Sequence, residues 1–281
     1  MISTNGCNMN NLSFPKIMGI LNITEDSFSD GGIYFSHESA LERAREMIQQ
    51  GADLIDIGAE STRPGAAMIS AEVEWQRIKP VLKAIKQEYP EMEISIDTQK
   101  SYVAALAIEH QADIINDISA LTWDPGMALI LRQNPHIKLI LMHMQGRPET
   151  MQLNPHYEDV VSEILTFLRA RISFATDQGI NPANLIVDPG IGFDKTLQHN
   201  LDILHHLEQF KQLGCPLVLG ASRKIFINML CPSTPADRLG GSLAAATIAC
   251  LNQVDYIRVH DVFAHRQFLE VLKAIYKGGD A

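Results

Sequence analysis

Polar residues or glycine-rich turns end six short apolar runs of this chain. Asp97 and Asp188 end runs in the segments SIDT and VDPG, and Asn116 ends another. A carboxylate can accept two hydrogen bonds from a ring that carries an N–H beside an exocyclic amine, and a carboxamide adds a donor and an acceptor. These side chains therefore predict a site for a flat ring with a hydrogen-bonding edge. For Asp97, an N-cap of the following helix is the alternative interpretation.

Basic side chains follow the seventh of these runs and lie within the eighth. Lys224 lies in the small-residue turn GASRK, where it can supply a point charge or a donor. Arg258 and His260 are two positions apart, so strand alternation places them on one face. Together they indicate an anionic partner, and a guanidinium can also stack on an aromatic ligand. The alternative is an internal salt bridge from Arg258 to a buried aspartate, either Asp56, Asp97 or Asp188.

Two residues could ligate a metal ion. Asn22 ends the first run, and its carboxamide oxygen could bind a hard cation or form a turn; the local sequence favours neither. For His143, a satisfied core or rim histidine is the preferred interpretation, because a metal-dependent hydrolase barrel would need an early His-x-His pair. The chain has no Ser-His-Asp set, Walker loop or dinucleotide fingerprint, so acyl transfer, ATP use and nicotinamide chemistry have no support.

These residues need a scaffold that brings strand ends together. The apolar runs, rich in Ile, Leu and Val, are Ile17–Asn22, Leu54–Gly58, Ile94–Asp97, Ile114–Asn116, Leu139–His143, Leu185–Asp188, Leu217–Ser222 and Ile257–His260. Such runs are typical of strands buried on both faces. Alternating with helices in 281 residues, they predict an α/β protein with a single (β/α)8 TIM barrel, whose chemistry occurs at the carboxyl ends of its strands.

Helix-like segments follow most of the runs. They are His37–Gln50, Ala71–Glu88, Lys100–His110, Pro125–Gln133, Tyr157–Gln178, Leu197–Leu213, Pro235–Leu251 and Val262–Tyr276. Long polar loops, Thr24–Ser36 and Ala59–Ser70, separate the first two strands from their helices, and such loops in a compact barrel are usually functional. The polar, Asn-rich residues 1–14 are predicted to form a flexible leader, and residues 15–281 are predicted to form one domain.

Composition limits the class of protein. A formal net charge of −10 and a pI near 5.4 argue against general nucleic-acid binding, although a local basic cluster can still hold an anionic substrate. No apolar run approaches the length of a membrane span. The four cysteines form no CxxC pair, which favours a reduced cytoplasmic protein with structural thiols.

Taken together, the motifs resemble dihydropteroate synthase. MGILNITEDSFSDGG, IDIGAESTRPG, SIDT, DIIND, LMHMQGRP, VDPGIGF, LGASRK, GGSLA and IRVHDV occur in the order of that family, from Lys16 to Val262. The resemblance implies a pterin-binding (β/α)8 barrel of folate biosynthesis that uses Mg²⁺. It would condense 6-hydroxymethyl-7,8-dihydropterin diphosphate with para-aminobenzoate, giving 7,8-dihydropteroate and pyrophosphate. It also implies small-molecule partners, a homodimer and competition by sulfonamides.

The resemblance assigns a role to each candidate residue. Asn22 would hold Mg²⁺ on the diphosphate. The pterin edge would bind Asp97, Asn116, Asp188 and Lys224. Arg258 would stack on the pterin and, with His260, hold the diphosphate. The para-aminobenzoate side would be built by Phe28, Asp30, Thr62, Arg63 and Pro64. Asp30, Arg63, Lys224 and Arg258 are the residues expected to act in catalysis.

The chain departs from the family at three positions. Glu25 replaces a usual Pro, Asp194 a common Gly, and Ile225 a frequent Ser. Two other functions compete with the synthase. A pterin-binding methyltransferase barrel would not need Phe28, the STRPG loop or a diphosphate clamp. A pterin-binding paralogue without turnover is opposed by the intact Arg63 and left open by Glu25 and Ile225.

Overall fold

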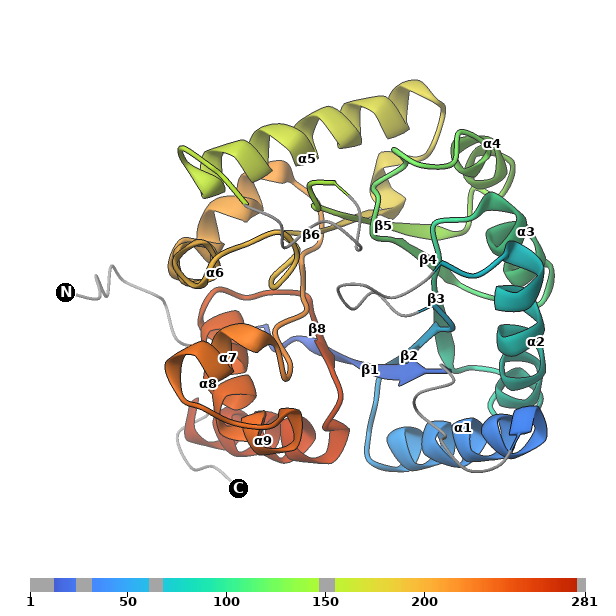
Figure 1. The fold of residues 1–281 in the computed structure, drawn as a ribbon, viewed down its shortest axis with the longest axis horizontal. Helices are drawn as coiled ribbons and strands as arrows, with labels where there is room; N and C mark the ends of the chain where they lie inside the picture. The colour runs from blue at the N-terminus through green and yellow to red at the C-terminus, as the bar shows by residue number, and fades with distance from the viewer. Residues whose placement is uncertain (1–12, 24–31, 61–67, 147–154, 277–281) are drawn as a thin grey trace.

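The computed structural model describes residues 13–23, 32–60, 68–146 and 155–276, with the backbone alone for residues 32–36. In these residues, eight parallel strands alternate with helices that surround them (Figure 1). The strands are β1 (Lys16–Asn22), β2 (Leu54–Gly58), β3 (Glu93–Asp97), β4 (Ile114–Asp117), β5 (Lys138–Met142), β6 (Leu185–Asp188), β7 (Val218–Leu219) and β8 (Tyr256–Val259). The predicted (β/α)8 barrel is confirmed.

The strands form an almost closed ring. Their hydrogen-bonded order is β6-β5-β4-β3-β2-β1-β8-β7, so β1 lies between β2 and β8. The remaining seam, between β6 and β7, is joined by a parallel bridge between Val187 and Leu217, and the Val187 N–H donates to the Pro216 carbonyl at 2.9 Å. Ring closure brings the carboxyl ends of all the strands to one mouth.

Alternation along the strands explains their continuous apolar character. One set of side chains packs together inside the ring: Met18, Leu54, Ile114, Ile140, Ile186, Val218 and Tyr256. Their sequence neighbours, such as Ile17, Ile55 and Ile115, belong to the larger core beneath the helices. Successive strand residues point to opposite faces, and here both faces are buried.

Helices cover the outside of the barrel (Figure 1). They are α1 (Gly32–Gln49), α2 (Ala71–Glu88), α3 (Ser101–Glu109), α4 (Gly126–Gln133), α5 (Val160–Asp177), α6 (Leu197–His205), α7 (Ile225–Leu230), α8 (Leu239–Leu251) and α9 (Val262–Tyr276), with 3₁₀ turns η3 (Pro182–Asn184), η4 (Leu207–Leu213) and η5 (Pro235–Arg238). Side-chain caps fix several starts: Ser70 accepts the Val73 N–H, and Asp159 accepts that of Val161. Within the described ranges, none of these helices combines the length and apolarity that a membrane crossing would need.

Some predicted boundaries were wrong. Helix α1 begins at Gly32 rather than His37, so its backbone includes the last five residues of the predicted loop Thr24–Ser36. The short helix α7 was not predicted. The predicted helix Leu197–Leu213 is divided at His206 into α6 and η4. Strand β8 ends at Val259, since the next backbone N–H donates to a side chain rather than to a neighbouring strand.

Candidate active site

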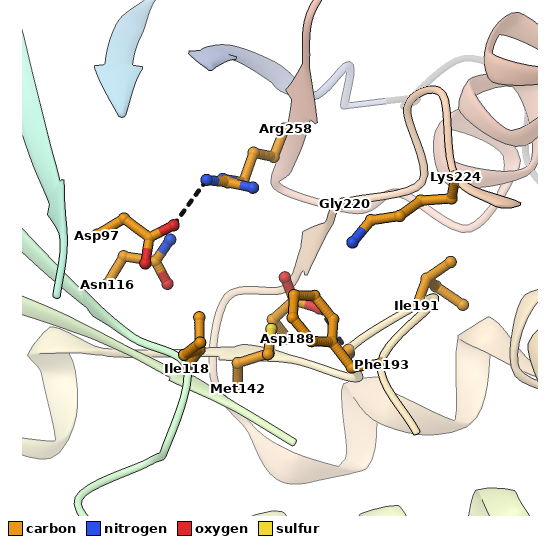
Figure 2. Close-up of a pocket in the computed structure, with 11 residues that line it drawn as sticks. Asp97, Asn116, Ile118, Met142, Asp188, Ile191, Phe193, Gly220, Lys224 and Arg258 are labelled. Atoms are coloured by element: carbon orange, nitrogen blue, oxygen red, sulfur yellow. Dashed lines mark hydrogen bonds and ion pairs between the residues drawn. The ribbon is translucent and has the colours of Figure 1, made fainter. Parts of the chain in front are cut away.

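A pocket lies at the carboxyl ends of the strands (Figure 2). It is lined by Asp97, Asn116, Ile118, Met142, Asp188, Gly190, Ile191, Phe193, Gly220, Lys224 and Arg258. Alternation accounts for much of this lining, because Asn116 follows the interior residue Ile114 by two positions and Asp188 follows Ile186 in the same way. The polar lining is therefore the next layer of the barrel interior, directly above the apolar one.

Arg258 is fixed by two carboxylates. Its Nε donates to Asp56 Oδ2 at 2.6 Å, and its Nη2 donates to Asp97 Oδ2 at 2.8 Å. Asp56 is fully buried, so its charge requires this partner. Burial raises the pKa of Asp97, and the attraction of the Arg258 cation opposes this shift. The internal salt bridge, given above as the alternative interpretation of Arg258, is present. The N-cap interpretation of Asp97 is wrong, because Lys100 occupies the N-cap position of α3.

Asn116 and Asp188 are both buried in the pocket wall. The Asn116 Nδ2 donates to Asp56 Oδ2 at 3.3 Å. Asp188 Oδ1 accepts the Gly190 N–H at 2.7 Å, and its Oδ2 is 3.7 Å from the point where a Cβ at Gly220 would stand. Burial raises the pKa of Asp188, while the Gly190 N–H and the nearby cations of Lys224 and Arg258 lower it. The glycine at position 220 leaves space beside the second carboxylate oxygen.

Lys224 faces Asp97 and Asn116 from the opposite side of the pocket (Figure 2). Its ammonium nitrogen lies 4.0 Å from the centroid of the Phe193 ring. Burial lowers the pKa of Lys224 to about 8, and the positive charge of Arg258 acts in the same direction. The Phe193 ring belongs to the apolar wall of the pocket, together with Ile118 and Met142, and these three side chains pack against one another and Met144. A flat ligand would therefore have polar partners at its edge and an apolar side chain at its face.

His260 lies beside the pocket and contacts Ser222. The Ser222 Oγ is 3.1 Å from His260 Nδ1 and accepts the His260 backbone N–H at 3.2 Å. Burial, with the cations of Arg258, Arg223 and Lys224 nearby, lowers the pKa of His260 to about 3. At neutral pH the imidazole is therefore uncharged, with one N–H donor and one acceptor nitrogen.

The structure brings Asp97, Asn116, Asp188, Lys224 and Arg258 into one pocket. Asn22 is exposed at the end of β1, with its Oδ1 3.6 Å from the position of a Cβ at Gly58. The loop candidates Phe28, Asp30, Thr62, Arg63 and Pro64, and the unusual Glu25, lie outside the described residues.

Sequence reasoning did not include Asp56 among the site residues. The sequence could have indicated this role, because Asp56 follows the interior residue Leu54 by two positions. Strand alternation therefore points the Asp56 side chain into the barrel, one layer above the apolar side chains inside the ring. The apolar wall was also missed. Phe193 follows a turn rather than ending a strand, so strand alternation could not place its ring.

His143 is a satisfied core histidine, as predicted. It is 3% exposed, and its Nδ1 lies 3.1 Å from the Lys195 ammonium. No group of three or more His, Cys, Asp or Glu side chains in the described ranges is placed to hold a metal ion.

The chain resembles proteins of known activity along nearly all its length. It matches the family described as pterin binding enzyme over residues 18–260. It is 45% identical to the dihydropteroate synthase of Escherichia coli K12 over 263 residues, covering 94% of this chain and 92% of that protein. The Yersinia pestis dihydropteroate synthase, solved as a sulfonamide drug complex, has 40% identity and a TM-score of 0.89, with 95% and 96% of the two chains covered.

A second solved structure carries the product of the reaction expected from the sequence. The dihydropteroate synthase of Xanthomonas albilineans, in complex with 7,8-dihydropteroate, has 36% identity and a TM-score of 0.84. The match covers 94% of this chain and 95% of that one. With the pocket geometry, these similarities show that the chain belongs to the dihydropteroate synthase family of pterin-binding enzymes.

Proposed function

We propose that this enzyme is a transferase that forms a C–N bond between a dihydropterin and para-aminobenzoate. The substrates would be 6-hydroxymethyl-7,8-dihydropterin diphosphate and para-aminobenzoate, and the products 7,8-dihydropteroate and pyrophosphate. The lining of the pocket is the main support for this proposal. Its polar side chains can bind the edge of a flat ring, and Phe193 in its apolar wall can contact the face of that ring.

The pterin edge matches the polar lining group by group. Its ring N–H and exocyclic amine are neighbouring donors, which suit the two oxygens of the Asp188 carboxylate. Its carbonyl and ring nitrogen are acceptors, which suit the Lys224 ammonium and the Asn116 amide. Asp97 would accept a further ring N–H while remaining paired with Arg258.

The reaction needs no side-chain nucleophile. The C–O bond between the pterin methylene and the diphosphate breaks, and the amine nitrogen forms the new C–N bond and then loses a proton. Developing positive charge spreads into the electron-rich ring, where Asp97 and Asp188 would stabilise it. The leaving diphosphate gains negative charge, and donors of Arg258 and His260 would stabilise that. Arg258 has five N–H groups, and the two carboxylates are bound through its Nε and Nη2.

Mg²⁺ fits the donor chemistry at Asn22. The exposed carboxamide at the end of β1 offers one oxygen, and Mg²⁺ is commonly held by one or two protein groups, several waters and substrate phosphates. Asn22 would hold the ion against the diphosphate, where it would neutralise leaving-group charge when bound.

The para-aminobenzoate side rests on the sequence alone. Phe28, Thr62 and Pro64 would surround the amine substrate, and Asp30 and Arg63 would act in the chemical step. We further propose a cytoplasmic homodimer with small-molecule substrates.

Pyrophosphate release tests the proposed reaction. Purified protein with Mg²⁺ and the pterin diphosphate should release pyrophosphate at a rate that depends on para-aminobenzoate, with dihydropteroate formed in equal amount. Pterin binding without release under these conditions would instead indicate a binding protein, and the absence of pterin binding would contradict the proposal.

A further inference from the structure

A buried lysine lies behind the pocket wall. Lys195 is 2% exposed, and its ammonium nitrogen is 2.9 Å from the Phe193 carbonyl oxygen, 3.1 Å from His143 Nδ1 and 3.4 Å from Asp194 Oδ1. An ammonium has three N–H donors, and these three acceptors match that number. Because an unpaired buried charge is costly, the contacts hold the Lys195 side chain in one place.

Asp194 supplies the negative charge for this lysine. It is 2% exposed, and its Oδ2 accepts a hydrogen bond from the Tyr157 hydroxyl. Its backbone φ is +46°, in the left-handed region that favours glycine. This chain therefore places a carboxylate at a position where glycine would fit the backbone more easily. Burial raises the pKa of Asp194 and lowers that of Lys195 to about 8, and their mutual attraction opposes both shifts.

The lysine supports the turn between Gly190 and Phe193. The turn is closely packed, since a Cβ at Gly190 would lie 2.0 Å from the His143 carbonyl oxygen. The Phe193 N–H donates to the Gly190 carbonyl at 3.2 Å, and Lys195 binds the Phe193 carbonyl from behind. The Phe193 ring then lies 4.0 Å from the Lys224 ammonium inside the pocket. Phe193 thus contacts both lysines, Lys195 through its carbonyl oxygen and Lys224 through its ring.

We propose that Lys195 is a positioning residue for the pterin site, which holds the Phe193 ring against Lys224. This inference rests on the proposed function. Without the ammonium, the Phe193 carbonyl and His143 Nδ1 lose the donor that binds them both, so the turn relaxes and the Phe193 ring moves. Lys224 then loses its neighbour, and the face of the pterin loses part of its apolar contact. Loss of the Lys195 ammonium should therefore lower the affinity for the pterin substrate rather than that for the amine substrate.

Calorimetric titration with the pterin diphosphate tests this role in Lys195→Met. We expect pterin affinity to fall about tenfold or more, which is about 1.4 kcal/mol. The KM for para-aminobenzoate at saturating pterin should stay within about twofold of the wild-type value, because the amine side is proposed to be built by Phe28, Thr62 and Pro64 rather than by this turn. Unchanged pterin affinity in a folded Lys195→Met protein would overturn the proposal.

Lys86→Met is the matched control. Lys86 is also buried, and it donates to the Met92 carbonyl at 2.8 Å and to Asp113 Oδ2 at 2.7 Å. These partners lie beside the amino ends of β3 and β4, at the opposite end of the barrel from the pocket. Lys86→Met should lower stability and leave pterin affinity unchanged. An equal affinity loss in both variants would mean that Lys195 acts through general stability, and would contradict the inference.

A double-mutant cycle with Phe193→Ala separates positioning from independent effects. If Lys195 acts through the Phe193 ring, the Lys195→Met change should cost less than about threefold in affinity once that ring is absent. Losses that multiply in full would contradict the proposed route. Should Lys195→Met fail to fold, Lys195→Gln replaces it in the same cycle, because its amide retains a donor.

The wild-type titration distinguishes failure of this inference from failure of the proposed function. A wild-type protein that binds no pterin would refute the proposed function. Normal wild-type binding with an unaffected Lys195→Met variant would refute only the role of Lys195.

Discussion

Arg258 Nε donates to the fully buried Asp56 at 2.6 Å, and this contact joins β8 to β2 across β1. The same guanidinium binds Asp97 on β3. Arg258 is therefore held in position before any ligand binds. A pre-positioned cation can stabilise developing charge without reorganisation, which is the most effective arrangement for electrostatic catalysis.

Removing the charge of Asp56 should weaken both the fold and the site. In Asp56→Asn we expect the free energy of unfolding to fall by about 1.5–3 kcal/mol, the usual contribution of a hydrogen bond to a charged group. Pterin affinity should fall as well, because Arg258 loses one of its two anchors. Denaturant unfolding at neutral pH measures the first effect. Glu270→Gln is the control, since its exposed ion pair with Lys273 should contribute little. A change below ~0.5 kcal/mol in Asp56→Asn would contradict this account.

Asp188→Asn should lose pterin binding. The substitution turns one acceptor oxygen into a donor that faces the donors of the pterin edge. The cost should be about 1.5–3 kcal/mol for each charged hydrogen bond lost. Calorimetry with the pterin diphosphate measures it, and Asp202→Asn on α6, outside the pocket lining, serves as the control. A folded Asp188→Asn protein that binds pterin normally would remove this residue from the recognition site.

Pterin affinity should decrease as the pH rises above about 8, the pKa of Lys224 in the free protein. The charged form of Lys224 donates to the pterin, so binding is full below that pKa and weakens above it. Burial is the main cause of this lowered pKa; the cations of Arg258 and Lys195 lower it further, and the carboxylates of Asp188 and Asp97 oppose the shift. Lys224→Met should bind weakly at neutral pH and show a flatter pH dependence. An identical pH profile in the variant and the wild type would exclude Lys224 as the titrating group.

The free energy of unfolding of the ligand-free protein should rise with pH above about 8, whereas pterin affinity should fall. The folded-state pKa of Lys224 is lowered to about 8 from 10.5, so between these values the unfolded chain binds more protons than the folded one. The free energy of unfolding of the ligand-free protein therefore rises with pH across this window. Since the pKa of Lys195 is also about 8, the slope in Lys224→Met should decrease rather than vanish. A steeper slope in Lys224→Met would show that the sign is wrong.

Turnover should require a divalent cation. We expect EDTA to abolish pyrophosphate release and Mg²⁺ to restore it, and Asn22→Ala to raise the Mg²⁺ concentration that gives half the maximal rate. Pterin diphosphate binding, titrated at several Mg²⁺ concentrations, gives a second readout independent of turnover. Full activity in protein verified to contain no metal would remove Asn22 from this role.

The barrel and most of the polar lining of the pocket could be predicted from the sequence. Its apolar runs reveal strands buried on both faces, and residues at the run ends must then meet at one mouth of a closed ring. Asn116, Asp188 and Arg258 follow interior residues by two positions, so alternation alone turns them into the pocket. These features depend on local periodicity, which a single sequence carries.

The pairing of side chains in the site could not be predicted from the sequence, because it depends on the tertiary structure. Arg258 and Asp56 are 202 residues apart, and they meet because β1 lies between β2 and β8 in the ring. Lys195 reaches His143 and the Phe193 carbonyl only because a turn with two positive-φ glycines folds its side chain back beneath the pocket. Hydrogen bonds and ion pairs form between atoms within about 3 Å, and such proximity depends on strand order and turn conformation rather than on residue type.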